Sequence, residues 1–424
     1  MKHLVLMLIV IASGCQSIRM AQNKQRVKKS FDQTLLSKHF TGFALYDPEA
    51  KEWLYKHNSD KYFTPASNVK ILSLYAGTKL LGDSLPAIKY TYREDTLIFS
   101  GLGDPTFLHP DFAKHPAFDF LKSHPGPLVF SPNPISSYSY GPGWNWDDYP
   151  FDYQPERSPF PIYGNVVRVE ASPNPGIKTT PDFFEDNIVP TVVPNQELRY
   201  PDHNIFVVNT TRKSDRLIPF RTYPELTSSL LMDTLSRKVT IDEKTFFGHV
   251  LYSQSTDHLL AIMMKRSDNF FAEQLLLMCS STLSDSLNAE KVIGYVISRY
   301  LRDLPDQPIW VDGSGLSRYN LITPRSQVRL LEKLRVEKGE EWLFDIFPVG
   351  GVSGTIKDWY PGVTKPYVYA KTGTLRNNHN LSGYLKTKTG KTLIFSFMNN
   401  NYTTTSGQVK QQIQNILEII RDGY

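Results

Sequence analysis

Three short motifs stand far apart along the chain, and their order constrains the fold more than any other feature of the sequence. They are Ser67-Asn68-Val69-Lys70, Ser267-Asp268-Asn269 and Lys371-Thr372-Gly373. Together they hold what a serine nucleophile needs: a hydroxyl, a base to take its proton, and polar groups to assist. A Ser-x-x-Lys string alone arises by chance about once or twice in a chain this long. The three motifs together are far more specific, so we expect a fold that brings them into one site.

The first motif is predicted to lie at the start of a helix. Pro65 suits the turn before a helix or its first position, and an apolar periodic run ending at Leu81 follows. Lys70 then stands about one turn after Ser67 on the same face. A neutral Lys70 could accept the serine proton. Burial and a second cation, for which Lys371 is the candidate, would lower the pKa of Lys70 toward that role.

The second motif is predicted to open a helix that continues from Phe270. Ser267 or Asp268 could simply be a helix cap, which is what an isolated Ser-Asp-Asn most often is. The companion motifs favour a role in chemistry. In that interpretation the Ser267 hydroxyl relays a proton between Lys70 and a leaving amine, and the Asn269 amide binds the substrate backbone.

The tripeptide Lys-Thr-Gly occurs twice, at residues 371–373 and 388–390. The second copy lies in a polar turn between two apolar runs, which is typical of a solvent-facing β-hairpin tip. The first copy follows residues 367–370, which we predict to be an inner strand. We therefore expect the first copy to line the cleft.

Lys371 of this first copy is a predicted catalytic residue, and Thr372, Gly373 and the following Thr374 are predicted to bind substrate. Lys371 would supply positive charge for a terminal carboxylate, and Thr372 a hydroxyl. The Thr374 N–H would join the Ser67 N–H to form an oxyanion hole.

Four further segments carry a resemblance to a known family. The chain resembles the low-molecular-mass class C penicillin-binding proteins of the penicillin-binding protein 4 type, which are D-alanyl-D-alanine carboxypeptidases and endopeptidases. The resemblance runs from about Phe40 to the C-terminus. It rests on the three motifs and on Gly101-Leu102-Gly103-Asp104-Pro105-Thr106, Trp144-Asn145-Trp146-Asp147-Asp148, Asp312-Gly313-Ser314-Gly315-Leu316-Ser317-Arg318 and Gly350-Gly351-Val352-Ser353-Gly354-Thr355.

This resemblance implies an α+β fold in which helices cover an antiparallel sheet, as in serine β-lactamases and DD-peptidases. It implies that Ser67 attacks the carbonyl between two D-alanines, or across a D-Ala cross-link, in peptidoglycan stem peptides. Water then hydrolyses the acyl-enzyme. β-Lactams should acylate Ser67 because they present a strained amide of the same shape. We expect no cofactor, and no metal because no His, Asp and Glu cluster has ligand spacing.

Residues 138–163 concentrate aromatic rings, prolines and acids. They form either a binding wall over the cleft or a rigid loop packed on its own region. By resemblance, Asp148 occupies the place of an acid that contacts the free amine of a diamino-acid side chain. Arg318 either helps to bind the same stem peptide or forms a structural ion pair.

Proline content divides the chain, because 20 of the 29 prolines fall between Pro105 and Pro224. This stretch lies in the 200-residue gap between Ser67 and Ser267. The simplest account is an insertion between two halves of one catalytic domain. Strand patterns at residues 91–100 and 163–171 predict that the insertion is β-rich.

The N-terminus is typical of an exported protein. A basic start precedes the apolar run Leu4 to Ala12, which is too short to span a bilayer, and small residues then lead to Cys15. Cys15 resembles a bacterial lipoprotein acylation site, with ordinary signal cleavage as the alternative. Residues 19–29 carry five positive charges, which suggests a flexible tether. The predicted parts are a signal peptide (1–14), a lipidated tether (15–30), a discontinuous catalytic domain (31–82 and 248–424) and an inserted accessory region (83–247).

These features place the protein on the periplasmic side of the cell envelope, held to a membrane through its lipid. The only other cysteine, Cys279, is predicted to be a buried core thiol. A net charge of +5 with no run of like charge in the body gives no case for nucleic-acid binding.

Two rival functions stay open. A β-lactamase or esterase of the same fold would share the motifs, although the large insertion favours a polymer-derived substrate. A non-catalytic envelope-binding scaffold would have no need of Lys70 or Ser267.

Overall fold

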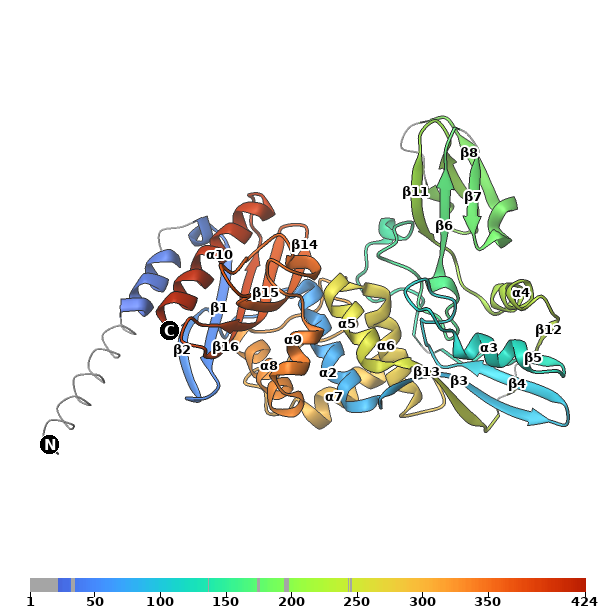
Figure 1. The fold of residues 1–424 in the computed structure, drawn as a ribbon, viewed down its shortest axis with the longest axis horizontal. Helices are drawn as coiled ribbons and strands as arrows, with labels where there is room; N and C mark the ends of the chain where they lie inside the picture. The colour runs from blue at the N-terminus through green and yellow to red at the C-terminus, as the bar shows by residue number, and fades with distance from the viewer. Residues whose placement is uncertain are drawn as a thin grey trace, which may run out of the picture.

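The computed structural model describes residues 22–31, 35–135, 137–173, 176–193, 198–242, 244 and 246–424. Its first sheet is antiparallel, in the order β14-β15-β16-β1-β2, so strands from both ends of the chain pair directly (Figure 1). The predicted α+β class is confirmed. The strands are β1 (Phe40–Asp47), β2 (Glu52–His57), β14 (Val368–Leu375), β15 (Asn378–Lys386) and β16 (Thr392–Asn400).

Helices cover both faces of this sheet. Along β1, Ala44 and Tyr46 enter one hydrophobic core, whereas Phe43 and Leu45 enter the other, as the alternation of a strand requires. The Phe43 face is covered by α10 (Ser406–Gly423). The Ala44 face is covered by α2 (Lys70–Leu80), α5 (Thr256–Ile262), α6 (Asn269–Ser281), α7 (Ala289–Tyr300), α8 (Pro324–Lys338) and α9 (Glu340–Ile346).

Helices α2 and α6 form the centre of the catalytic half. Residues 70–77 of α2 and 270–280 of α6 are all buried, so neither helix has a solvent face. Gly77 allows close packing, because a Cβ there would lie 3.3 Å from Leu275. The N-termini of these two helices carry the first two motifs, which are thereby held in the protein interior.

Strand β14, which carries Lys371, is an edge strand, and this corrects the predicted inner strand. Among the strands it pairs with β15 only. Its other edge bonds first to residues 348–350, where the Gly350 N–H donates to Val368 and the Ala370 N–H donates to Pro348, and then faces the short helix η2 (Ala66–Val69). A Cβ at Gly373 would overlap the carbonyl oxygen of Pro65, so glycine is what lets strand and helix approach. Because this edge is covered, the sequence pattern of β14 resembles that of an inner strand, and this is why we predicted one.

The second Lys-Thr-Gly copy lies at the tip of the β15–β16 hairpin, as predicted. Gly390 has φ +89°, which suits this tight turn. The Lys388 side chain is 64% exposed and forms an ion pair with Asp422 at 3.2 Å.

The chain leaves the catalytic half through β3 (Ser84–Arg93) and returns through β13 (His249–Ser255), which pair with each other. Between them lie sheets of order β12-β5-β4-β3-β13, β11-β6-β7 and β8-β10-β9. The remaining strands are β4 (Thr96–Gly101), β5 (Leu128–Phe130), β6 (Val166–Ala171), β7 (Ile177–Thr180), β8 (Ile188–Thr191), β9 (Leu198–Arg199), β10 (Phe206–Asn209), β11 (Ser214–Pro219) and β12 (Val239–Ile241).

One hydrophobic core unites this inserted region. It joins residues of β3 to β6, β10 and β11 with two helices, α3 (Pro116–Ser123) and α4 (Pro224–Leu235). The strand pattern predicted over 91–100 belongs to two strands, because a turn with Glu94 at φ +54° divides it. Short helices elsewhere are η1 (Leu35–Lys38), η3 (Trp146–Asp148), η4 (Tyr163–Asn165), η5 (Asp182–Asn187), η6 (Met263–Ser267) and η7 (Gly354–Ile356).

The end of the predicted tether differs from expectation, because residues 22–31 form a helix. Asn23, Val27 and Phe31 are spaced four residues apart and form a buried stripe, with Val27 and Phe31 in the core under α10. The Asn23 amide also donates to the carbonyl of Gly423. Four of the five charges that suggested a solvated tether, those within residues 24–29, are exposed on this docked helix, and Arg19 lies outside the described residues.

The predictions for the two cysteines have different outcomes. Cys279 is fully buried in α6, and burial raises the pKa of its thiol, so it is the inert core thiol that we predicted. Cys15, the signal peptide and the tether up to residue 21 lie outside the described residues. In the part of the chain that the structure covers, every helix is too short or too polar to cross a membrane.

Candidate active site

Ser67 and Lys70 meet at the junction of η2 and α2. Lys70 begins α2 directly after η2, and its Nζ lies 3.0 Å from the Ser67 Oγ. The same Nζ donates to the Asn269 side-chain oxygen and to the Ser314 carbonyl, each at 2.6 Å. Lys70 is thus held on three sides with its nitrogen directed at the serine.

The Lys70 side chain is buried, and this burial lowers its pKa to about 8. Carboxylates of Asp268, Asp312 and Glu273 oppose the shift, because each stabilises the ammonium form. Desolvation is the larger effect. A lysine with a pKa near 8 supplies a useful neutral fraction at physiological pH, which an ordinary lysine does not.

Ser267 lies at the end of the π-helical turn η6, immediately before α6. Its backbone has φ +63°, a strained conformation for a serine, and its Oγ accepts from Lys371 Nζ at 2.7 Å. Asp268 is the N-cap of α6 and accepts from the Phe271 N–H at 2.8 Å. The capping role and the site role therefore coexist in this motif, carried by different residues.

Asn269 makes different contacts from those predicted. Its amide nitrogen donates to the carbonyl of Tyr153 at 2.9 Å, and its oxygen accepts from Lys70. The side chain thus joins the base to the inserted region in this substrate-free arrangement. Binding substrate through this amide would require exchange of the Tyr153 contact.

Residues 371–374 of strand β14 line the cleft beside η2. Thr372 Oγ1 lies 2.7 Å from Thr355 Oγ1, which brings the 350–355 loop to the site. Thr374 Oγ1 lies 2.8 Å from Nδ1 of the buried His379. Gly373 packs against the turn that carries Ser67, because a Cβ there would overlap the Pro65 carbonyl and lie 2.8 Å from the Asn68 backbone nitrogen.

The two motif lysines influence each other. Burial lowers the pKa of Lys371 well below its ordinary value, and the positive charge of Lys70 lowers it further. This pair of lysines therefore favours binding of an anion, since a carboxylate bound beside Lys371 would stabilise the ammonium form of Lys371.

Asp148 lies in η3, in the segment that reaches the site through Tyr153. Asn145 donates to its carboxylate at 3.0 Å, and the Tyr153 hydroxyl interacts with it. The neighbouring Trp146 ring is 83% exposed. The segment therefore borders the site. Asp148 is linked to Asn269 through Tyr153, whose hydroxyl contacts Asp148 and whose carbonyl accepts from Asn269.

Arg318 lies at the far end of β14. Its guanidinium donates to the Arg376 carbonyl at 3.1 Å, and none of the ion pairs found among the described residues involves it. A cavity of about 520 Å³ opens here, lined by Thr374, Arg376 and Asn377 among others. Arg318 thus bonds the backbone beside this cavity, and its role in binding the stem peptide stays a prediction.

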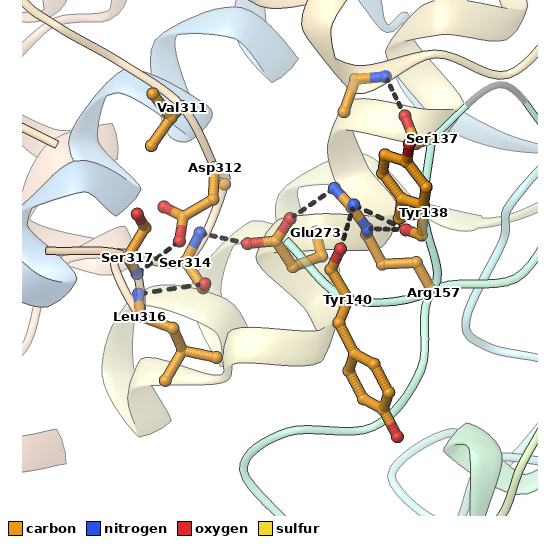
Figure 2. A network of polar contacts seen from close by, with 12 residues as sticks. Ser137, Tyr138, Tyr140, Arg157, Glu273, Val311, Asp312, Ser314, Leu316 and Ser317 are labelled. Carbon is orange, nitrogen blue, oxygen red and sulfur yellow. Dashed lines mark hydrogen bonds and ion pairs between the residues drawn. The ribbon is translucent and has the colours of Figure 1, made fainter. Parts of the chain in front are cut away.

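One functional group that the sequence did not predict is the carbonyl of Ser314, which accepts from Lys70. Several hydrogen bonds hold its loop: the Gly313 carbonyl accepts from Ser73 at 2.6 Å, and Asp312 accepts from the N–H groups of Gly315 and Ser317. Figure 2 shows the bond between Asp312 and Ser317. The segment Asp312–Arg318 is one of those that carry the family resemblance. A backbone carbonyl has no residue-type signature, so its contact could not be predicted.

Among the described residues, no three His, Cys, Asp or Glu side chains are grouped so as to hold a metal ion. What the arrangement offers is a serine, a lysine of lowered pKa and a second serine–lysine pair, which together suit acyl transfer.

Comparison with known proteins agrees with this chemistry. The D-Ala-D-Ala carboxypeptidase 3 (S13) family matches residues 23–192 and 224–422. The chain is 24% identical to the D-alanyl-D-alanine carboxypeptidase DacB of Haemophilus influenzae, across 90% of each chain. It is 22% identical to penicillin-sensitive carboxypeptidase A of Dictyostelium discoideum, over 89% of this chain and 85% of that one.

Solved structures show the same fold. Penicillin-binding protein 4 from Haemophilus influenzae superposes with a TM-score of 0.76 at 21% identity, covering 93% of this chain and 99% of its own. A predatory peptidoglycan endopeptidase from Bdellovibrio bacteriovorus superposes with a TM-score of 0.52 at 16% identity, covering 88% and 90%. Since both cover nearly the whole chain, the likeness in fold includes the inserted region.

Proposed function

This chain belongs to the D-Ala-D-Ala carboxypeptidase 3 (S13) family and is a serine-type D-Ala-D-Ala carboxypeptidase, and from that premise we propose that Ser67 forms the acyl-enzyme with Lys70 as its base. One observation carries the proposal: the buried Lys70 Nζ lies 3.0 Å from the Ser67 Oγ. With its pKa lowered to about 8, Lys70 can take the hydroxyl proton near neutral pH.

Acylation follows from this geometry. The Ser67 oxygen attacks the carbonyl carbon of the penultimate D-Ala while its proton passes to Lys70. The carbonyl oxygen becomes an anion, which the N–H groups of Ser67 and Thr374 stabilise. The C–N bond then breaks, and the leaving amine takes the proton that Lys70 accepted. Ser267, whose Oγ accepts a hydrogen bond from Lys371 at 2.7 Å, relays this proton. Water later attacks the ester, so the acid is released and the serine is restored.

Substrate recognition begins at the start of β14. Lys371 and Thr372 would bind the terminal carboxylate, and this anion would raise the lowered pKa of Lys371 by stabilising its charge. The stem peptide would then run past β14 toward Arg318 and the cavity at Arg376. Asp148 would meet a free amine on the opposite side. The same site would accept a D-Ala cross-link if its leaving amine belongs to a second stem peptide.

Purified muropeptides test this function. Wild type should release D-Ala from monomers or split cross-linked dimers, and Ser67→Ala should do neither, with products identified by mass. A Lys388→Met variant is the matched control, since it alters the second Lys-Thr-Gly copy at the far hairpin tip. Identical products from wild type and Ser67→Ala would refute Ser67 as the nucleophile.

The two rival functions are separated by penicillin. A persistent covalent adduct on Ser67 supports the peptidase, whereas rapid turnover of penicillin would favour a β-lactamase. A wild type that labelled penicillin fails to mark would revive the scaffold.

The position in the envelope is also a proposal. Acylation at Cys15, which stands seven residues before the helix of residues 22–31, would anchor the protein to a membrane on the periplasmic side. Labelled palmitate should enter wild type and not Cys15→Ser, and Cys15→Ser should leave the membrane fraction. Equal labelling of both would contradict the anchor.

A further inference from the structure

Helix α6 lies where the catalytic half contacts the inserted region. Its residues Asn269 and Glu273 are four apart and share a face, and each contacts both sides. Asn269 joins Lys70 to the Tyr153 carbonyl, as described above. Glu273 repeats this arrangement one turn further along, and it does so with a charged group.

On the catalytic side, Glu273 holds the loop that holds Lys70. Its Oε1 accepts from the Ser314 N–H at 2.7 Å (Figure 2). The Ser314 carbonyl in turn accepts from Lys70 at 2.6 Å. A single residue therefore separates the carboxylate from the base. Gly315 lies against the turn that carries the nucleophile, since a Cβ there would overlap the Ala66 carbonyl and lie 2.9 Å from the Ser67 backbone nitrogen. Glu273 fixes the other side of this loop.

On the inserted side, Glu273 meets Arg157. Its Oε2 lies 3.5 Å from the Arg157 Nη1, and each side chain is only 1% exposed. The remaining guanidinium donors bind backbone carbonyls of the aromatic segment, at Tyr138 (2.6 Å) and Tyr140 (3.1 Å). Figure 2 shows Arg157 between Glu273 and these two residues. Because the pair is buried, loss of either partner leaves an uncompensated charge in the interior.

A second link runs in parallel. Trp144, in the same aromatic segment, donates its indole N–H to Asp312 at 2.9 Å. Asp312 also binds the Gly315 N–H at 2.8 Å, so it fixes the same loop as Glu273. The Arg157 guanidinium lies over the Trp144 ring, 5.7 Å from its centre. Two buried acids thus tie one catalytic loop to one inserted segment.

We propose that Glu273 is a positioning residue that fixes the Ser314 carbonyl, and hence Lys70, and that its bond to Arg157 makes the inserted region part of the catalytic apparatus. The inference rests on the proposed role of Lys70 as base. Glu273 touches neither substrate nor Ser67, so it acts only through Ser314 and through its charge.

The charge role has a definite sign. The Glu273 carboxylate stabilises the ammonium form of Lys70, so its removal lowers the pKa of Lys70. The acid limb of the acylation profile, which is the pH range where the rate falls because Lys70 is protonated, then moves to lower pH. Burial raises the pKa of Glu273 itself, Asp312 raises it further, and Arg157 opposes both. The charged groups that face Lys70 and Glu273 from the surrounding elements are Asp268, Asp312, Arg157 and Lys371.

The test measures the rate at which fluorescent penicillin acylates the full chain, as a function of pH. Glu273→Gln keeps an oxygen for the Ser314 N–H and removes the charge, so its acid limb should move to lower pH while its plateau stays within about threefold of wild type. Glu273→Leu also removes the acceptor, so its plateau should fall by about tenfold or more.

Variants of Arg157 test the connection to the insertion. Arg157→Met should move the acid limb in the same direction as Glu273→Gln, since a carboxyl without its cation is neutral in this site. The double variant should move it no further than the larger single change. Arg157→Lys keeps the cation and should keep the wild-type limb.

Asp104→Asn is the matched control for burial. This carboxylate is 4% exposed, lies in the inserted region next to α6, and accepts from the Thr106 N–H and from Ser253. It has no bond to the Lys70 loop, so it should lose stability without moving the acid limb. Thermal unfolding of every variant reports this stability separately from the rate.

Two results would overturn the proposal. If Glu273→Leu kept both the wild-type limb and the wild-type plateau, Glu273 would be structural only. If Arg157→Met and Asp104→Asn gave the same profile, the insertion would be uncoupled from Lys70. Failure of wild type to be labelled would instead refute Lys70-assisted acylation, and the inference with it, whereas labelling that Ser67→Ala abolishes keeps the function in place.

Discussion

The two Lys-Thr-Gly tripeptides have the same sequence and opposite surroundings. The copy at residues 371–373 lies on a strand edge closed by η2, with Lys371 fully buried and bonded to Ser267. The copy at 388–390 lies at a hairpin tip, where Lys388 is 64% exposed and pairs with Asp422. The residues do not carry the chemistry by themselves. A lysine becomes reactive when burial lowers its pKa and a second motif is within reach, and only the first copy has both.

The largest expected contrast is between Lys371→Met and Lys388→Met. The first should lower kcat/KM on D-Ala-D-Ala peptides by about 10²- to 10³-fold, because it removes the carboxylate partner and the support of Ser267. The second should change it by less than about twofold, in line with a surface site. Steady-state release of D-Ala measures both. A large loss in Lys388→Met would mean that the hairpin copy contributes to catalysis.

The glycines sharpen the same contrast. In Gly373→Ala the added Cβ would overlap the Pro65 carbonyl and lie 2.7 Å from Asn68 Nδ2, so β14 must move away from Ser67. Penicillin acylation should slow by about 10²-fold, as expected for a displaced catalytic geometry. In Gly390→Ala nothing lies within 4 Å, and only φ +89° is strained. That variant should lose about 1 kcal/mol of unfolding free energy and keep its acylation rate.

The dependence on pH separates the two copies more finely. Acylation needs neutral Lys70, so its rate should fall about tenfold per pH unit below the pKa near 8 and level off above it. Lys388→Met should have the same profile as wild type. Stopped-flow acylation between pH 5 and 10 would measure this, and a rate independent of pH below 7 would exclude Lys70 as the base.

The smallest effect concerns stability. Loss of the exposed Lys388–Asp422 pair in Lys388→Met should lower the unfolding free energy by less than about 1 kcal/mol, since surface ion pairs contribute little. Denaturant unfolding at low and high salt would measure it. A larger loss would show that the hairpin tip anchors α10 through more than this pair.

The sequence predicted the parts of the site that depend on spacing along one helix or strand. The pair Ser67 and Lys70, the helix after Ser267 and the choice of Lys371 over Lys388 are of this kind. Contacts made by backbone groups were not predictable, as the Ser314 carbonyl shows. Glu273 was detectable in principle, since it stands one helical turn after Asn269.

Parts of the fold were missed because they depend on tertiary packing. Strand β14 reads as an inner strand, since η2 buries its open edge. Residues 22–31 read as a tether, since their four positive charges mask the pattern of only three docked side chains. Neither covering element is adjacent in the sequence to what it covers.

The meeting of Asn23 with Gly423 has a practical consequence for handling the enzyme. Both ends of the described chain lie on the α10 side of the sheet, whereas Ser67 lies on the α2 side (Figure 1). A fluorescent reporter fused after Tyr424 would therefore emerge beside the N-terminal helix and leave the cleft open. The same proximity makes a circularly permuted chain feasible, with a short linker from Tyr424 to residue 22 and new ends at an exposed loop of the inserted region.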